Sequence, residues 1–347
     1  MKYQMVPENP MEEKALKSSP AARPLFDPFL PPLQARSIMA GVRLGIFKAI
    51  GQKARTAEEL SQELSLDAEC LELLLRVLTC AGYVTCQGNR YSLTELTRMT
   101  LLPDSPMQLS GWVEYNYIHW NVVDKLEEVL KTGKGIGLHQ SIGDPANWAV
   151  QQQAMLETAR PAAPMVASLV PIKDGAKKML DIGGSHGLYG TTICRKHPPM
   201  RSEVIELPEA VEHARNLARM EKIADVVSHR AGDVLKDDLG SGYDAVFLGG
   251  ITHHFTPAQN QKLLQQIKTA LTQGGTIAIW DFKRPEPDAE PDLVGDGLAL
   301  FFRITSAAQC YTPSDYIGWI ETAGFVDVKV HPTPFSPANI LVTGLVP

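Results

Sequence analysis

The stretch Lys177–Gly190 decides the fold; it reads Lys-Lys-Met-Leu-Asp-Ile-Gly-Gly-Ser-His-Gly-Leu-Tyr-Gly. Its short apolar run Met179–Ile182 is typical of a buried strand in a parallel sheet, and Leu188–Cys194 predicts the beginning of a helix after a tight glycine turn. Open parallel sheets bind ligands at the carboxyl ends of their strands, and glycines let a ligand approach the main chain. We therefore expect a cofactor at this turn, although glycine clusters also occur in ordinary turns.

Length and charge narrow the class of protein. The chain has 347 residues, 44% of them hydrophobic, which suffices for two domains with their own cores. The formal net charge is −6. Nucleic acids and anionic membranes attract clustered Lys and Arg, so neither is expected as the main partner. A small molecule fits this composition better.

The five cysteines are scattered without CxxC spacing, so neither a zinc site nor a disulfide framework is indicated. This favours a reducing, cytoplasmic location. No apolar run is long enough to span a membrane, and the polar residues 1–20 contain several acids, unlike a signal or transit peptide. We expect those residues to form a flexible tail.

Residues 21–105 have the pattern of a winged helix. Apolar side chains recur at helical spacing over Leu33–Ile50, and Thr56 with Glu59 forms a capping box for a helix that ends at Leu64. A second helix follows from Asp67 to about Gly82. Two strands, Tyr83–Cys86 and Arg90–Leu93, complete the motif as a hairpin.

Winged helices commonly bind DNA, but the charges here argue against it. The second helix carries Asp67, Glu69 and Glu72 against the single Arg76, and such a helix repels phosphates. A mainly α-helical dimerisation domain is the favoured interpretation. A ligand-sensing regulator that binds DNA is kept as a third hypothesis.

Residues 106–170 are predicted to be helical and are rich in aromatic and thioether side chains. Core packing explains most such residues. As a group placed directly before the glycine turn, they are also suited to line an apolar substrate pocket. Trp120, Met155 and Met165 are our candidates.

Residues 171–347 alternate between strands and helices, which predicts an α/β domain with a parallel sheet covered on both faces. The end of the chain differs, because Val326–Val330 and Ile340–Val346 are separated only by a proline-containing loop and must pair antiparallel. The expected strands before them are Glu203–Leu207, Val226–Ala231, Asp244–Leu248 and Thr276–Trp280, with helices over Pro208–Met220 and Pro257–Thr272.

A parallel sheet closed by a terminal β-hairpin resembles the Rossmann-like sheet of class I S-adenosylmethionine-dependent methyltransferases. The family's glycine turn reads Asp-x-Gly-x-Gly-x-Gly. Asp181, Gly183 and Gly187 match it, while Ser185 stands in place of the middle glycine. The resemblance implies that the turn, including Gly184, admits the methionine portion of S-adenosyl-L-methionine.

Two acidic residues follow successive strands at the positions where the family binds the nucleoside. Glu206, followed by Leu207, ends the second strand, where a carboxylate accepts hydrogen bonds from both ribose hydroxyls. Asp233 follows the third strand between Gly232 and Val234. By the resemblance, Asp233 meets the adenine amino group and Val234 packs on the ring.

With the winged helix included, the resemblance narrows to the caffeate, acetylserotonin and polyketide O-methyltransferases, and it covers Leu33 to the C-terminus. The most specific stretch is Asp244–Phe255, Asp-Ala-Val-Phe-Leu-Gly-Gly-Ile-Thr-His-His-Phe. It is similar to the family's fourth strand and the catalytic histidine beyond it. The resemblance implies that His253 is the general base and that Asp281, after the fifth strand, orients its imidazole.

The match has gaps. Cys310 stands where the family has a second carboxylate, so it is a candidate only for contact with substrate, and Gly249 replaces a lysine that often faces adenine. Relatives that bind S-adenosylmethionine without transferring its methyl group, and that hydroxylate or decarboxylate polyketides, are therefore an open alternative. No role is assigned to His186, His229 or His254.

The sequence thus predicts a homodimeric O-methyltransferase of secondary metabolism. We expect it to methylate a hydroxyl, phenolic in the simplest case, of an aromatic or polyketide-like small molecule. No metal, nucleic acid or membrane is expected to take part.

Overall fold

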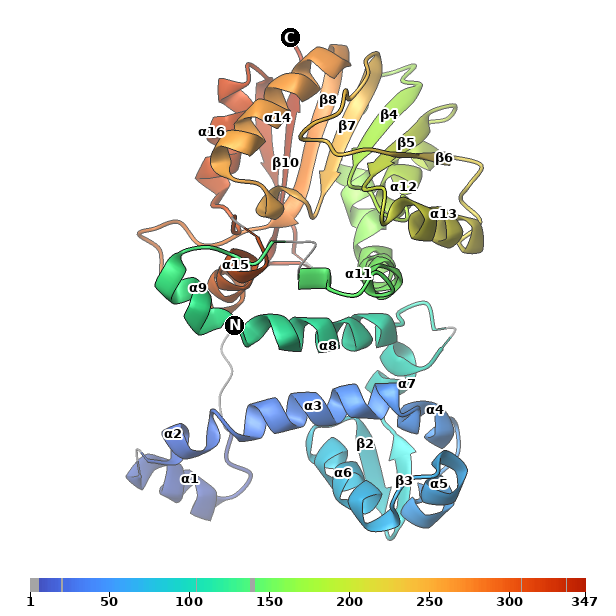
Figure 1. Ribbon diagram of the computed structural model, residues 1–347, viewed down its shortest axis with the longest axis vertical. Helices are drawn as coiled ribbons and strands as arrows, with labels where there is room; N and C mark the ends of the chain where they lie inside the picture. Colours follow the sequence, from blue (N-terminus) through green and yellow to red (C-terminus); the bar gives the residue numbers. More distant parts are fainter. Residues whose placement is uncertain (1–5, 20, 104, 138–140, 307, 335) are drawn as a thin grey trace. The chain divides into compact units, whose positions relative to one another are not determined.

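The computed structural model describes residues 6–19, 21–103, 105–137, 141–306, 308–334 and 336–347 (Figure 1). The chain divides into two compact units, one that ends at Tyr117 and one that begins at Ile118.

The first unit is mainly α-helical. The predicted single helix over Leu33–Ile50 is wrong, because Gly45 adopts φ +72° and divides the segment into two helices. A helix, α1, also lies inside the segment expected to be a flexible tail. The helices are α1 (Pro10–Ser18), α2 (Ala22–Phe26), α3 (Leu30–Arg43), α4 (Ile46–Ile50), α5 (Ala57–Leu64), α6 (Ala68–Cys80) and α7 (Glu95–Leu101).

The winged-helix pattern is confirmed in this unit. Thr56 and Glu59 form the predicted capping box of α5, and Asp67 caps α6 through the N–H of Cys70. Each such cap stabilises a helix by about 1 kcal/mol. The strands β1 (Arg55–Thr56), β2 (Val84–Gln87) and β3 (Arg90–Leu93) form an antiparallel sheet in the order β1-β3-β2.

The described helices that come next in the chain include α8 (Ser110–Val123), α9 (Leu126–Thr132) and α11 (Asn147–Leu169). The sheet has seven strands in the order β6-β5-β4-β7-β8-β10-β9. Their bounds are β4 (Lys178–Ile182), β5 (Arg201–Glu206), β6 (Val227–Ala231), β7 (Tyr243–Gly249), β8 (Leu271–Phe282), β9 (Val326–His331) and β10 (Asn339–Leu345).

The predicted topology is confirmed. Strands β4 to β8 pair in parallel, and the terminal strands β9 and β10 pair antiparallel as the short loop between them requires. Strand β10 inserts between β8 and β9 and runs antiparallel to both. This arrangement is the α/β sheet with a terminal β-hairpin that the sequence predicted.

Helices cover both faces of the sheet (Figure 1). On one face, α14 (Pro257–Ala270) and α16 (Pro313–Thr322) pack against alternate strand residues such as Leu180 and Val246. On the other face, α11 and α12 (Leu188–Lys196) pack against Met179 and Phe247. The remaining elements are α13 (Val211–Met220), the 3₁₀ turn η1 (Thr252–His254) and α15 (Leu293–Thr305).

Helix boundaries follow local chemistry. The capping box of Thr256 and Gln259 begins α14 at Pro257 as predicted, and Thr312 with Asp315 forms a similar box for α16. Helix α13 begins at Val211, three residues after the predicted start at Pro208. Because β4, β5, β6, β7 and β8 all end on one edge, the loops that follow them meet there, and this edge carries the site.

Candidate active site

The glycine turn between β4 and α12 has two glycines in the left-handed backbone region. Gly183 adopts φ +60°, and a Cβ atom there would lie 2.3 Å from Cδ1 of Ile251. Gly187 adopts φ +76° at the N-terminus of α12, where a Cβ atom would lie 2.6 Å from Val227. Side chains at these positions would be both strained and too close to their neighbours, so the turn depends on glycine for its shape.

Ser185 replaces the family's middle glycine yet keeps a left-handed backbone, with φ +51°. Three contacts stabilise this conformation: its hydroxyl donates to Oε1 of Gln152 on α11, its N–H donates to Glu206 (3.0 Å), and its carbonyl accepts from Nε2 of His229 (2.9 Å). The Ser185 side chain therefore points at α11. Gln152 and His229 were not predicted as site residues, and no local pattern in the sequence marks them.

His186, also unassigned from sequence, has a structural role in the same turn. It is 2% exposed, and its Nδ1 accepts the N–H of Leu188 (2.9 Å), the first residue of α12. Burial is the main cause that lowers its pKa to about 3. A histidine held neutral in this way stabilises the start of the helix.

Asp181 has the most unusual environment in the turn. Its side chain is 1% exposed, and within the described part of the chain neither carboxylate oxygen has a hydrogen-bond partner. A Cβ atom on Gly184 would lie 2.3 Å from its Cγ, so the glycine is needed for close packing. Burial, increased by the charge of Glu206, raises the pKa of Asp181 to about 7. An unsatisfied buried carboxylate favours a cationic partner.

Glu206 ends β5 beside the turn and is 8% exposed. One carboxylate oxygen accepts the N–H of Ser185 (3.0 Å), and the other accepts the N–H of Leu207 (2.8 Å). Burial raises its pKa. A carboxylate oxygen can accept two hydrogen bonds, so each oxygen of Glu206 retains the capacity to accept one more, as two ribose hydroxyls require.

The loop after β6 carries the other predicted nucleoside contacts. The N–H of Gly232 donates to the carbonyl of Glu206 (2.9 Å), which joins the ends of β5 and β6. Asp233 accepts the N–H of Leu235 (3.0 Å) and pairs with Lys236 (2.7 Å). Val234 is 6% exposed and belongs to the core beside α14. Contacts of Asp233 and Val234 with adenine remain predictions.

His253 and Asp281 lie together, as the resemblance implied. His253 is in η1 after β7, Asp281 is on β8, and Nδ1 of His253 lies 2.5 Å from Oδ1 of Asp281. Both residues are buried, with exposures of 3% and 0%. A buried carboxylate at this distance orients an imidazole and stabilises its protonated form.

Asp281 is held as an anion by donors on every side. Its Oδ2 accepts the N–H of Thr252 (2.8 Å) and the Thr252 hydroxyl, while its Oδ1 also accepts the N–H of Phe282 (2.7 Å). Burial alone would raise the pKa of Asp281, but attraction to His253 and these hydrogen bonds outweigh it and lower the pKa. The hydroxyl of Tyr316 lies 3.0 Å from that of Thr252 and completes the network. Thr252 and Tyr316 were missed in the sequence.

An aromatic wall lies against the imidazole of His253. The ring of Phe302 on α15 stacks on His253, with centroids 3.7 Å apart, and Phe282 lies 5.7 Å from the same imidazole. Cys310 is fully buried and packs with Phe302 and Ala299 behind this wall. Burial, followed by the charge of Asp281, raises the pKa of the Cys310 thiol. Cys310 is therefore a neutral, apolar group in this structure.

The three other predicted pocket residues lie on helices α8 and α11. Met165 packs against the core between α11 and the sheet. Met155 lies one turn after Gln152 on α11, and its carbonyl accepts the Thr158 hydroxyl (3.1 Å). Trp120 lies on α8, whose neighbouring His119 contacts Phe301 of α15 edge-on at 4.7 Å. Contact of these side chains with a substrate remains a prediction.

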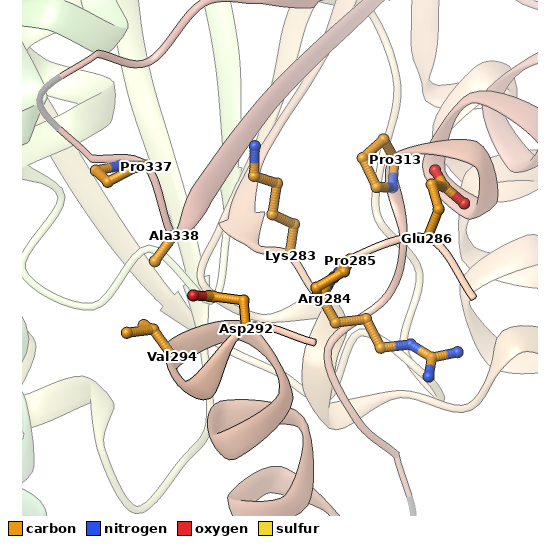
Figure 2. A pocket seen from close by; sticks show the side chains of 9 residues that line it. All are labelled: Lys283, Arg284, Pro285, Glu286, Asp292, Val294, Pro313, Pro337 and Ala338. Atoms are coloured by element: carbon orange, nitrogen blue, oxygen red, sulfur yellow. The ribbon is translucent and has the colours of Figure 1, made fainter. Parts of the chain in front are cut away.

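A cavity of about 410 Å³ lies beyond the end of β8 (Figure 2). None of the predicted site residues lines it. The lining side chains Lys283 and Arg284 point in different directions. Of the two lining carboxylates, Glu286 accepts hydrogen bonds from Ser314, and Asp292 caps the N-terminus of α15. The cavity is therefore separate from the His253–Asp281 pair, which is closed to solvent in this conformation.

No helix in the described ranges of the chain is both long and apolar enough to cross a membrane. No group of three or more His, Cys, Asp or Glu side chains in the same ranges is arranged to hold a metal ion.

The fold and this edge of the sheet define the class of S-adenosylmethionine-dependent methyltransferases. A solved structure of a putative O-methyltransferase from Nostoc punctiforme superposes with a TM-score of 0.83 at 26% identity, over 94% of this chain and 99% of that one. Human N-acetylserotonin methyltransferase, solved in complex with S-adenosylmethionine, shares the fold with a TM-score of 0.82 at 20% identity, over 94% and 98% of the two chains.

Sequence comparison identifies the family. The O-methyltransferase domain matches residues 115–326, and the O-methyltransferase dimerisation domain matches residues 35–103. A 3-hydroxy-5-methyl-1-naphthoate 3-O-methyltransferase from Streptomyces sahachiroi is 24% identical over 324 residues, which cover 90% of this chain and 92% of the relative. The chain belongs to the O-methyltransferase family and is an S-adenosylmethionine-dependent enzyme.

Proposed function

We propose that this enzyme transfers a methyl group to a phenolic hydroxyl of an aromatic or polyketide-like small molecule, with His253 as the general base. The observation that carries the proposal is the buried His253–Asp281 pair, with its 2.5 Å contact, on the strand-end edge that also holds the glycine turn. Asp281 would orient the imidazole and stabilise its charged form.

The residues of the turn fit the cofactor. When bound, S-adenosylmethionine supplies an electrophilic methyl group. The unpartnered carboxylate of Asp181 suits its cationic methionine end, and the remaining acceptor capacity of Glu206 suits its ribose hydroxyls. By the resemblance, Gly183 and Gly184 would admit the cofactor close to the main chain, and Asp233 would meet the adenine.

The chemistry explains why a base is needed. A phenol with a pKa of about 10 is mostly un-ionised at neutral pH and is then a poor nucleophile. A general base within hydrogen-bond reach typically accelerates such a step about 10²–10⁴-fold. The walls formed by Phe282 and Phe302 would exclude water from the imidazole and present an apolar surface to an aromatic ring.

Relatives that act on aromatic or polyketide-like molecules support this class of substrate. Besides the naphthoate enzyme, a mitomycin biosynthesis 6-O-methyltransferase from Streptomyces lavendulae is 24% identical over 320 residues. An N,N-dimethyltransferase from Streptomyces rimosus is 26% identical over 303 residues, so the acceptor atom differs among relatives. The buried acid–base pair favours oxygen here, because a phenol must lose its proton to react well.

The experiment combines purified protein, S-adenosylmethionine and a panel of naphthols, hydroxynaphthoates, anilines and non-aromatic alcohols. Product mass and S-adenosylhomocysteine are both measured, in the wild type and in His253→Ala. Methylated phenols that disappear in the variant support the proposal. Methylation at nitrogen only, or oxygen consumption without S-adenosylhomocysteine, would instead assign the chain another reaction.

We also propose a homodimer that acts in the cytoplasm, in secondary metabolism. The match to a dimerisation domain supports association, and exposed apolar side chains near the start of α3 supply a suitable surface. Phe29 is 61% exposed and Leu33 is 46% exposed.

A further inference from the structure

His254 contacts the predicted base directly. It follows His253 in η1, and the two Nε2 atoms lie 3.1 Å apart. The ring centroids are 4.2 Å apart and the ring planes are inclined by 59°. His253 is 3% exposed, whereas His254 is only partly buried.

The hydrogen-bond pattern assigns the protons. Asp281 is an anion and can only accept, so Nδ1 of His253 carries the hydrogen that it donates. Nε2 of His253 then carries no hydrogen and has a free lone pair. The hydrogen in the contact between the two Nε2 atoms must therefore belong to His254. Neutral His254 in this tautomer leaves its Nδ1 as an acceptor.

That Nδ1 atom has no donor. It is buried and has no hydrogen-bond partner among the residues that the structure describes. Burial is the main cause that holds the pKa of His254 well below its ordinary value, so the ring is neutral near neutral pH. A buried acceptor without a donor is costly, by about 1–3 kcal/mol, and a hydroxyl that approaches it removes this cost.

We propose that His254 is the first acceptor of a two-histidine proton relay. The substrate hydroxyl donates its proton to Nδ1 of His254, while the Nε2 hydrogen of His254 passes to Nε2 of His253. The O–H bond breaks, and the oxygen would bond to the methyl carbon while the bond from that carbon to the sulfonium sulfur breaks, its electron pair staying on sulfur as S-adenosylhomocysteine. His253 ends as an imidazolium beside Asp281, with the number of protons conserved. This inference rests on the proposed function, since it requires a hydroxyl acceptor.

The relay explains an arrangement that direct transfer does not. Direct transfer to His253 requires the hydroxyl to displace the His254 N–H from the only free lone pair of the base. The relay keeps that contact and uses the partnerless nitrogen instead. Every other transfer follows a hydrogen bond that is already present.

The test compares His254→Phe, which keeps an aromatic ring but removes both nitrogens, and His254→Asn, which keeps a donor but cannot pass on a proton. His197→Ala is the matched control, because His197 follows the end of α12, at the opposite end of that helix from the glycine turn. Thermal unfolding and S-adenosylmethionine affinity establish that each variant is folded. The rate is measured as kcat and KM for phenols of increasing acidity.

The relay predicts that both His254 variants lose about 10²-fold or more in kcat with a weakly acidic phenol. It also predicts that this loss shrinks as the phenol becomes acidic enough to ionise by itself. A second readout uses cofactor-free protein with a chromogenic nitrophenol at a pH below the phenol's own pKa, where the free phenol is un-ionised: the bound phenolate spectrum should appear in the wild type and the control, and be lost in both variants.

An unchanged or increased kcat in His254→Phe, together with a loss in His253→Ala, would overturn the relay and show that His254 merely covers the base. A loss that is equal for all phenols would also overturn it. If the wild type methylates no hydroxyl at all, the proposed function fails. In that case the nitrophenol spectrum still decides the relay, because it needs no methyl transfer.

Discussion

Nδ1 of His253 lies 2.5 Å from Oδ1 of Asp281, and this contact fixes which imidazole nitrogen is available to take a proton. Four donors surround the Asp281 carboxylate, so it remains ionised although it is fully buried. Cys310, which the resemblance aligns with the family's second carboxylate, packs with Phe302, and Phe302 stacks on His253. In the proposed mechanism Asp281, held by these hydrogen bonds, therefore orients the imidazole of His253.

Asp281→Asn tests this single acid. An amide presents an NH₂ group to donors that need acceptors, so we expect a loss of about 10²–10⁴-fold in kcat and of about 1–3 kcal/mol in the free energy of unfolding. S-adenosylmethionine affinity should not change. Steady-state kinetics and urea unfolding measure these effects, with the exposed Asp288→Asn as control. Wild-type kcat in Asp281→Asn would remove Asp281 from the mechanism.

Asp181 should make stability depend on pH. Its pKa is raised by burial to about 7 in the folded chain, against about 3.9 when unfolded. Between these two values the folded state holds the extra proton, so this residue's contribution to the free energy of unfolding falls as pH rises from about 4 to about 7. Urea unfolding across this range should show that slope in the wild type and a flatter one in Asp181→Asn.

The same carboxylate links cofactor binding to pH. A cationic group beside Asp181 lowers its pKa, so binding releases a proton and affinity increases as pH rises through about 7. Calorimetry in buffers of different ionisation enthalpy measures the released proton. Equal proton release in the wild type and Asp181→Asn would show that another group is responsible.

Ser185 is a strained residue held by its hydrogen bond to Gln152. Ser185→Ala keeps the left-handed strain and leaves the buried amide oxygen of Gln152 without its donor, which costs about 1–3 kcal/mol. Ser185→Gly loses the same bond but regains about 1 kcal/mol from the relieved backbone. We expect urea unfolding to rank stability as wild type, then glycine, then alanine. An alanine variant as stable as the wild type would contradict this account of the turn.

The exposed apolar residues Phe29 and Leu33 should lie in the subunit interface. A charged side chain buried against a partner is costly, so the double variant Phe29→Asp, Leu33→Asp should elute as a monomer in size-exclusion chromatography with light scattering. Leu73 is also 61% exposed, on α6 of the same unit, and Leu73→Asp should remain a dimer. A double variant that stays dimeric would place the interface elsewhere.

Local patterns predicted much of the fold. The apolar strand before the glycine turn, the capping boxes at Thr56 and Thr256, and the antiparallel ending each depend on residues close together in the chain. The break at Gly45 was not predicted, because the apolar spacing continues across it and a glycine inside a helical pattern is often tolerated.

Contacts between distant residues were harder to predict. His253 and Asp281 were found only through the resemblance to a family, since nothing in their spacing of 28 residues requires contact. Gln152, Thr252 and Tyr316 carried no signal, because a polar side chain gains its role from a partner that the fold brings near. The substitution at Ser185 was visible in the sequence, but the direction of its side chain was not.

The central claim is methyl transfer to a phenol that depends on His253. The most direct measurement is the rate of S-adenosylhomocysteine formation with a hydroxynaphthoate or related phenol, compared between the wild type and His253→Ala at matched cofactor occupancy. We predict an O-methylated product and a fall in kcat of about 10²–10⁴-fold in the variant. An unchanged rate in a folded, cofactor-binding His253→Ala protein would contradict the account.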